Sequence, residues 1–299
     1  MLTFCPTMRA AVIFGLNSSE RDLKAFRESS DCEWIVGLPA RSSEADAIII
    51  FGGDGTVHRH LSRLVQLRLP VLIVPCGSGN DFARALKLPD RKASLAAWPE
   101  FVSGGGNLRE IDLGVITAIP ALNSAGAPPA PHQHYFCCVG GVGIDAEVAR
   151  RANSLPRWLR GHGGYLLSLL PTLLRFDPVK ANISIHGSTG RERSIVLAAF
   201  ANAPSYGGGM KIAPRAKMDD GLLDVCLVRT LNKAKLLTAF PTVYFGRHLG
   251  MEEVEYVQTS KLRIDTEKPV DVYADGEYVC KTPIEVSVAR NGLKLIVSP

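Results

Sequence analysis

The first third of the chain alternates short apolar runs with segments whose apolar residues recur at helical spacing. This alternation is typical of an α/β protein with a doubly wound parallel sheet. Strands are predicted at residues 9–15, 34–37, 47–51 and 71–75. Helices are predicted at residues 20–28, from an N-cap at Thr56 through Val65, from Asn80 and Asp81 to Leu86, and at residues 93–101.

Beyond glycines 104–106 the pattern changes to strands separated by turns, which predicts a mostly antiparallel β domain. Its strands are expected at residues 108–117, 135–139, 181–186, 194–201, 222–228, 261–265, 270–274, 284–289 and 293–297. We therefore divide the chain into domains at residues 1–107 and 108–299. The last strands are apolar enough to return to the first domain.

Composition and charge narrow the class of protein. The chain has 299 residues, of which 46% are hydrophobic and 21% charged, so it is long enough for two globular domains. Its net charge of +5 is too small to indicate a dedicated nucleic-acid binder. Seven scattered cysteines without a CxxC pair indicate reduced thiols, and no run of about 18 apolar residues or signal peptide is evident, so we expect a cytoplasmic protein.

Two glycine-rich turns follow the third and fourth predicted strands. The first contains Gly52, Gly53, Asp54, Gly55 and Thr56, and the second contains Gly77, Ser78, Gly79, Asn80 and Asp81. Glycines let a backbone approach an anion, and the N-terminus of the following helix attracts phosphate. Asp54 suits a role in holding Mg²⁺ or a nucleotide hydroxyl. Because parallel strands end at one edge of a sheet, both turns are expected to face one nucleotide, although an ordinary tight turn is the alternative.

Two further segments each fit two interpretations. Asn17, with the serines that follow it, fits either a phosphate contact or a helix cap. Residues 146–176 place four arginines (Arg150, Arg151, Arg157 and Arg160) and Trp158 before a leucine-rich stretch. This pattern favours either a membrane interface or leucines packed in a core with solvated arginines.

The ordered set of motifs resembles the diacylglycerol kinase catalytic family, which includes bacterial lipid kinases and sphingosine kinases. The resemblance rests on the two glycine turns and on residues 111–114, 140–146, 202–209, 213–225 and 275–277, and it covers nearly the whole chain. It implies an ATP-binding domain followed by a lipid-binding domain, with an NAD kinase-like or diacylglycerol kinase-like fold and the substrates in the cleft between the two domains.

The resemblance also implies roles for particular residues. The two turns would bind the nucleotide phosphates, with Asp54 and Asp81 serving a catalytic Mg²⁺. A separate structural Mg²⁺ would be bound by the backbone carbonyls of Lys217 and Leu222 and the carboxylate of Asp220.

Asp275 or Glu277 would be the general base that takes the proton of the attacking lipid hydroxyl. The sequence does not choose between them, and residues 274–277 also fit a plain hairpin turn. His58 and Arg59 stand where the family pattern has Asn and Glu, and residues 41–44 stand where a nucleotide-contacting threonine is expected, so nucleotide contacts are expected to differ.

The sequence therefore predicts an ATP- and Mg²⁺-dependent lipid kinase that converts diacylglycerol to phosphatidic acid. A sphingoid base or another lipid alcohol is an alternative substrate. A soluble-substrate kinase is a second possibility, since NAD kinases and phosphofructokinases share the first turn, and a catalytically weak regulatory protein that binds nucleotide or lipid is a third. Peripheral contact with the inner membrane face and a homodimer are both compatible with this interpretation.

Overall fold

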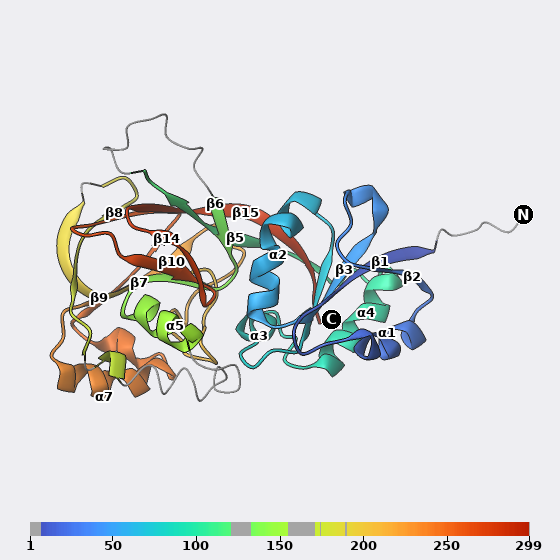
Figure 1. Ribbon diagram of the computed structural model, residues 1–299, viewed down its shortest axis with the longest axis horizontal. Helices are drawn as coiled ribbons and strands as arrows, with labels where there is room; N and C mark the ends of the chain where they lie inside the picture. Colours follow the sequence, from blue (N-terminus) through green and yellow to red (C-terminus); the bar gives the residue numbers. More distant parts are fainter. Residues whose placement is uncertain (1–6, 121–132, 155–170, 174, 189, 299) are drawn as a thin grey trace, which may run out of the picture. The chain divides into compact units, whose positions relative to one another are not determined.

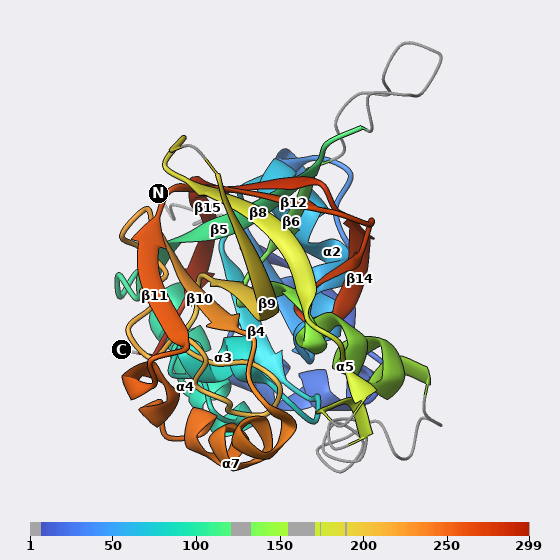
Figure 2. The ribbon, with the colours of Figure 1, turned by 90° about the vertical axis from the view of Figure 1, so that its left-hand side faces the viewer.

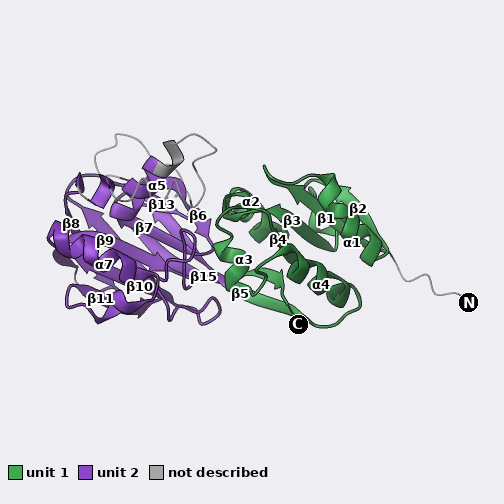
Figure 3. Ribbon diagram, turned by 90° about the horizontal axis from the view of Figure 1, so that it is seen from below, with its two compact units in different colours: residues 1–111, 291–299 green, residues 112–290 purple. Residues whose placement is uncertain are grey.

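The computed structural model describes residues 7–120, 133–154, 171–173, 175–188 and 190–298. The chain forms two compact units (Figure 3). Unit 1 contains residues 1–111 and 291–299, and unit 2 contains residues 112–290. The first boundary therefore follows Ile111, a few residues after the predicted division at 107.

Unit 1 is built on a parallel sheet. Its strands are β1 (Met8–Phe14), β2 (Cys32–Val36), β3 (Ala47–Gly52) and β4 (Val71–Pro75), in the order β2-β1-β3-β4. All three pairings are parallel, as predicted. The end of the last strand, β15 (Ile284–Ile296), adds to the sheet beside β4, where Leu295 pairs with Val71.

Helices cover both faces of this sheet (Figure 1). They are η1 (Glu20–Leu23), α1 (Lys24–Ser29), η2 (Ser42–Glu44), α2 (Asp54–Leu67), α3 (Asp81–Ala85) and α4 (Arg91–Val102). The prediction that Thr56 is the N-cap of the second long helix is wrong. Gly53 is the N-cap of α2, because its backbone is still extended while Asp54 already begins the first turn.

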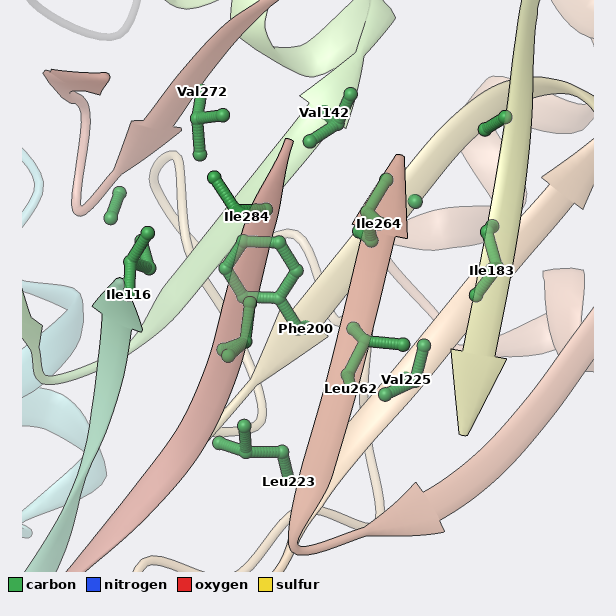
Figure 4. Close-up of a cluster of buried hydrophobic side chains, with 14 of the residues drawn as sticks. Ile116, Val142, Ile183, Phe200, Leu223, Val225, Leu262, Ile264, Val272 and Ile284 are labelled. Atoms are coloured by element: carbon green, nitrogen blue, oxygen red, sulfur yellow. The ribbon is translucent and has the colours of Figure 1, made fainter. Parts of the chain in front are cut away.

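Unit 2 is mostly antiparallel, as predicted. Its strands include β5 (Leu108–Ala118), β6 (Gln133–Phe136), β7 (Val139–Gly143), β8 (Val179–Ile185), β9 (Arg191–Ala201), β10 (Leu223–Arg229), β11 (Val254–Thr259), β12 (Lys261–Thr266), β13 (Asp271–Ala274) and β14 (Glu277–Lys281). The path β14-β13-β7-β9-β8-β12-β15 forms one sheet, and β10 pairs with both β9 and β11. Alternate side chains of these strands meet in a buried apolar cluster around Phe200, Leu262 and Ile284 (Figure 4).

Unit 2 also contains the helices α5 (Ile144–Ser154), α7 (Lys233–Val243) and η4 (Arg247–Gly250). The predicted strands at 284–289 and 293–297 prove to be one strand, β15, which continues through the polar residues Arg290 and Asn291. Among the described residues, no helix is both long and apolar enough to cross a bilayer. Most of the arginine and leucine segment at 146–176 lies outside the described residues.

Candidate active site

Three turns of unit 1 lie at the carboxyl edge of its sheet. The register pairs Phe14 with Phe51 and Gly52 with Pro75, so β1, β3 and β4 end side by side. The N–H of Cys76 donates to the carbonyl of Gly52 at 3.0 Å and ties the second glycine turn to the first. The prediction that both glycine turns share one edge is confirmed.

The two glycine turns touch through their backbones. A Cβ atom placed on Gly53 would lie 2.8 Å from the Cα of Gly77, and one placed on Gly77 would lie 2.7 Å from the Cα of Gly53. Real Cβ atoms do not approach backbone this closely, so each position requires glycine. The turns therefore form one continuous glycine-lined surface at the edge of the sheet.

Asp54 connects the first turn to the helix after the second. Its two carboxylate oxygens accept the backbone N–H groups of Asp81 and Phe82, each at 3.0 Å. These N–H groups open α3 and have no partner within that helix, so Asp54 caps α3 from a distant part of the chain.

The second turn is closed by its own side chains. Asn80 has φ of 54°, and its amide accepts the N–H of Gly77 at 2.9 Å and donates to the carbonyl of Gly77 at 2.7 Å. The buried carboxylate of Asp81 pairs with Arg84 at 2.6 Å. Asn80 thus shapes the turn, while Asp81 holds a charge at its rim.

The turn after β1 contains Asn17 and the two serines that the sequence singled out. The hydroxyl of Ser18 donates to the carbonyls of Phe51 at 2.7 Å and Gly15 at 3.1 Å. Gly15 leaves room for Thr56, whose Oγ1 would lie 2.6 Å from a Cβ at that position. Asn17 is exposed in the same turn. In the sequence, Gly15 before the polar residues 17–19 was the available indication of the contact between Gly15 and Thr56.

In unit 2, Asp275 and Glu277 flank the β13–β14 hairpin turn but have different surroundings. Both oxygens of Asp275 are used: they accept the N–H groups of Cys137 at 2.7 Å, Cys138 at 2.8 Å and Val139 at 3.3 Å. Glu277 is exposed at the start of β14. Asp275 therefore fixes the hairpin to the start of β7, whereas the carboxylate of Glu277 lies in solvent. Residues 274–277 do form a hairpin turn, and this turn can also carry the general base.

The segment at 217–224 gathers carboxylates. Asp220 accepts the N–H of Leu222 at 3.0 Å, and the buried Asp112 accepts the N–H of Gly221 at 2.6 Å. Asp224 is fully buried, where the hydroxyl of Tyr256 donates to it at 2.6 Å.

Burial raises the pKa of Asp224, and the charge of Asp220 raises it further. Mg²⁺ takes carboxylate and carbonyl oxygens as ligands, so the donor set expected at Asp220 fits Mg²⁺ in kind, and a cation there would offset the repulsion. The described residues contain no cluster of three or more His, Cys, Asp or Glu side chains able to hold a metal. The expected structural Mg²⁺ ligands are two backbone carbonyls and one carboxylate, so they do not form such a cluster of side chains.

An apolar cavity of about 80 Å³ lies within unit 2, lined mainly by aliphatic and aromatic side chains of α5, α7 and neighbouring strands. Tyr206 donates its hydroxyl to Asp145 at 2.7 Å in the cavity wall.

His248 also lines this cavity. Its Nε2 lies 3.1 Å from the carbonyl of Ile212, so Nε2 carries the proton, because a carbonyl can only accept. Burial lowers the pKa of this imidazole, which is therefore neutral at pH 7. Its Nδ1 is buried without a hydrogen-bond partner among the described residues.

Solved structures share this fold. The crystal structure of a diacylglycerol kinase from Bacillus anthracis superposes with a TM-score of 0.66 at 19% identity and covers 98% of this chain and 97% of that one. An NAD kinase from Archaeoglobus fulgidus in complex with ATP superposes with a TM-score of 0.52 at 14% identity, with 97% and 94% coverage. The chain therefore has the fold of these structures, with an α/β unit and an antiparallel β unit.

Sequence comparisons identify the family. Residues 19–116 match the diacylglycerol kinase catalytic domain, and residues 139–297 match the YegS C-terminal NAD kinase beta sandwich-like domain. The diacylglycerol kinase of Mycobacterium tuberculosis is 33% identical over 251 residues, covering 84% of this chain and 76% of that protein. A Xanthomonas euvesicatoria protein named "Probable lipid kinase YegS-like" is 28% identical over 265 residues, with 86% and 80% coverage. The chain belongs to the diacylglycerol kinase catalytic family and is a kinase of the lipid kinase class.

Proposed function

We propose that this kinase transfers the γ-phosphoryl group of ATP to the free hydroxyl of diacylglycerol, giving phosphatidic acid. The binding of ATP is supported by the contact between the two glycine turns. The turns form a surface without Cβ atoms at the carboxyl ends of β3 and β4, where α/β sheets bind ligands.

The phosphate-binding residues are those of the two turns. The backbone of Gly52, Gly53, Gly55 and Thr56, and of Gly77, Ser78 and Gly79, would line the phosphate site, with Asn17 beside it. Asp54 and Asp81 would hold the catalytic Mg²⁺, which supplies neutralisation of charge on the transferred group. Asp54 also orders the start of α3, so it positions Asp81 as well as contributing its own charge.

Glu277 is the general base in this proposal, and Asp275 positions it. The oxygens of Asp275 are committed to three backbone N–H groups, whereas Glu277 is exposed and free to meet a lipid hydroxyl. Deprotonation of that hydroxyl by Glu277 would raise its nucleophilicity toward the phosphoryl group.

The apolar cavity of unit 2 supports a lipid as the acceptor. It is lined by side chains such as Leu236, Phe240 and Met251, which match an acyl chain and not a sugar or nucleotide. The same cavity would also accept the chain of a sphingoid base, so the acceptor panel must include one.

The structural Mg²⁺ is a separate part of the proposal. The carboxylate of Asp220 and the carbonyls of Lys217 and Leu222 would hold it at the turn before β10. Its charge would stabilise the buried carboxylate of Asp224.

The test is transfer of labelled γ-phosphate to diacylglycerol, monoacylglycerol, sphingosine and ceramide in mixed micelles, with NAD and fructose 6-phosphate as soluble acceptors. We expect label on diacylglycerol. We also expect Glu277→Gln to lower kcat by about 10²–10⁴-fold, the usual contribution of a general base, while KM for ATP stays unchanged. Label on a soluble acceptor alone would contradict the lipid assignment, and full activity of Glu277→Gln would reject it as the base.

Asp54→Ala should also abolish transfer while leaving the protein folded. The lost cap on α3 costs only about 0.5–2 kcal/mol of stability. Circular dichroism and a thermal melt would confirm folding, and transfer by this variant at the wild-type rate would remove Asp54 from the site.

A further inference from the structure

Helix α7 carries two adjoining apolar rows, and only one of them faces the cavity. The first row lines the cavity and contains Leu236, Ala239, Phe240 and Val243. The second row, Leu237, Pro241 and Tyr244, follows the i, i+4, i+7 spacing of one helix face and is absent from the cavity lining. None of the residues of α7 is buried. A helix this apolar inside a folded domain normally buries one face completely.

The second row continues into the turn after α7. Phe245 follows Tyr244 and is 72% exposed. The guanidinium of Arg247 lies over the Phe245 ring, 5.8 Å from its centroid. A single exposed apolar residue is ordinary, but here an exposed ring extends a row of partly exposed apolar side chains. We call Leu237, Pro241, Tyr244, Phe245 and Arg247 the α7 surface.

Basic side chains lie at both ends of the α7 surface. Lys233 is exposed at the start of the helix, and Arg247 is exposed after its end. Lys235 is paired with Glu253 and so contributes little net charge. An apolar strip between cations has the composition of helices that lie in the interface of an anionic membrane. In Figure 2, α7 is seen along its whole length.

We propose that the α7 surface docks unit 2 onto an anionic lipid bilayer. Phe245, Pro241 and Leu237 enter the boundary between head groups and acyl chains, and Lys233 and Arg247 meet lipid phosphates. The opposite row of the same helix lines the cavity, so docking brings the cavity wall to the bilayer surface. The idea that the bilayer supplies the lipid acceptor rests on the proposed function. The docking itself does not require catalysis.

Vesicle co-sedimentation of the full chain tests the proposal directly. We expect binding to vesicles of phosphatidylcholine with phosphatidylglycerol, weaker binding to phosphatidylcholine alone, and loss of binding as salt is raised. Arg247→Glu should lower the partition coefficient at least about fivefold, since one basic residue near an anionic surface contributes about that factor. Phe245→Ser should lower it as well, because it removes the apolar ring that enters the boundary. Phosphorylation of a short-chain diacylglycerol dispersed below its micelle concentration should be unchanged in both variants.

Matched controls are available in unit 1. Val36 is 58% exposed and Arg27 is exposed, so Val36→Ser also replaces an exposed apolar side chain by serine and Arg27→Glu also reverses an exposed positive charge, both in the other unit. Equal vesicle binding by wild type, Phe245→Ser and Arg247→Glu would overturn the proposal, as would equal losses in the unit 1 controls. Loss of binding only on charge reversal at Arg157 and Arg160 would place the docking surface in that segment instead. Because vesicle binding needs no acceptor, failure of the kinase assay leaves this result interpretable.

Discussion

At the scale of single residues, the contact between Gly53 and Gly77 decides whether the nucleotide edge can form. We predict that Gly53→Ala lowers the free energy of unfolding by about 1–3 kcal/mol, because the added methyl would meet backbone, which cannot rotate away. Binding of ATP should weaken with it. Gly250→Ala is the control, since a Cβ there meets nothing within 4 Å. Chemical denaturation of the three proteins measures the difference, and equal stability of Gly53→Ala and wild type would contradict the contact.

His248 predicts a specific loss of stability in acid. Burial lowers its pKa in the folded protein below the unfolded value of 6.5. As pH falls below about 6.5, the unfolded chain binds a proton that the folded protein does not, so the contribution of His248 is present above that pH and is lost below it.

His248→Gln keeps a donor for the carbonyl of Ile212 but has no group that titrates in this range. We expect its unfolding free energy to fall less than that of wild type between pH 7.5 and 5.5. Denaturant melts across this range measure it, and parallel losses in the two proteins would show that other groups cause the acid sensitivity.

The positions of the glycine turns were predictable because a short apolar run followed by glycine, Asn and Asp indicates a strand that ends in a turn. The hydrogen-bond partners of the site carboxylates were not predictable. Asp54 accepts bonds from N–H groups 27 and 28 positions later in the chain, and Asp275 from groups more than 130 positions earlier. Such pairs depend on strand order, so the sequence could offer Asp275 and Glu277 together but could not separate their roles.

At the scale of elements, the parallel strands of unit 1 were predictable because their continuous apolar runs are short and end in glycine. Helix α7 was not predicted, since its apolar residues extend over more than one face and Pro241 lies inside it. The two halves of β15 were predicted as separate strands because Asn291, with φ of 50°, interrupts the apolar pattern where the chain passes from unit 2 to unit 1.

The end of β15 closes the sheet of unit 1, which makes it sensitive to truncation of side chains. Leu295 is fully buried and pairs with Val71 of β4. We predict that Leu295→Ala lowers the unfolding free energy of unit 1 by about 2–5 kcal/mol, the usual result of emptying a leucine site in a core. Lys294→Ala, next to it, removes only a 40% exposed side chain paired with Glu110 at 3.6 Å and should change it by less than about 1 kcal/mol. Limited proteolysis within unit 1 reports the difference, and equal protection of both variants would contradict a closing role for β15.

At the scale of the whole molecule, the chain enters unit 2 after Ile111 and leaves it after Arg290, so each unit has its own core and its own proposed ligand. Ligands that bind the folded state stabilise it by mass action, and the effect falls first on the unit that holds the site. The proposal therefore predicts two separable responses.

Hydrogen exchange on the full chain can separate them. Mg²⁺ alone should slow exchange at residues 217–224 and leave the glycine turns unchanged, because only the turn at Asp220 is proposed to bind the ion without nucleotide. Adding ATP should then slow exchange at residues 52–56 and 77–82. Asp220→Asn should remove the response of residues 217–224 to Mg²⁺ and keep the response of the glycine turns to ATP. Asp177→Asn, which changes an exposed carboxylate in unit 2, should keep both responses.

Protection of residues 217–224 by Mg²⁺ in Asp220→Asn would reject Asp220 as a ligand. A response of the glycine turns to Mg²⁺ alone would instead assign the ion to Asp54 and Asp81 before nucleotide binds.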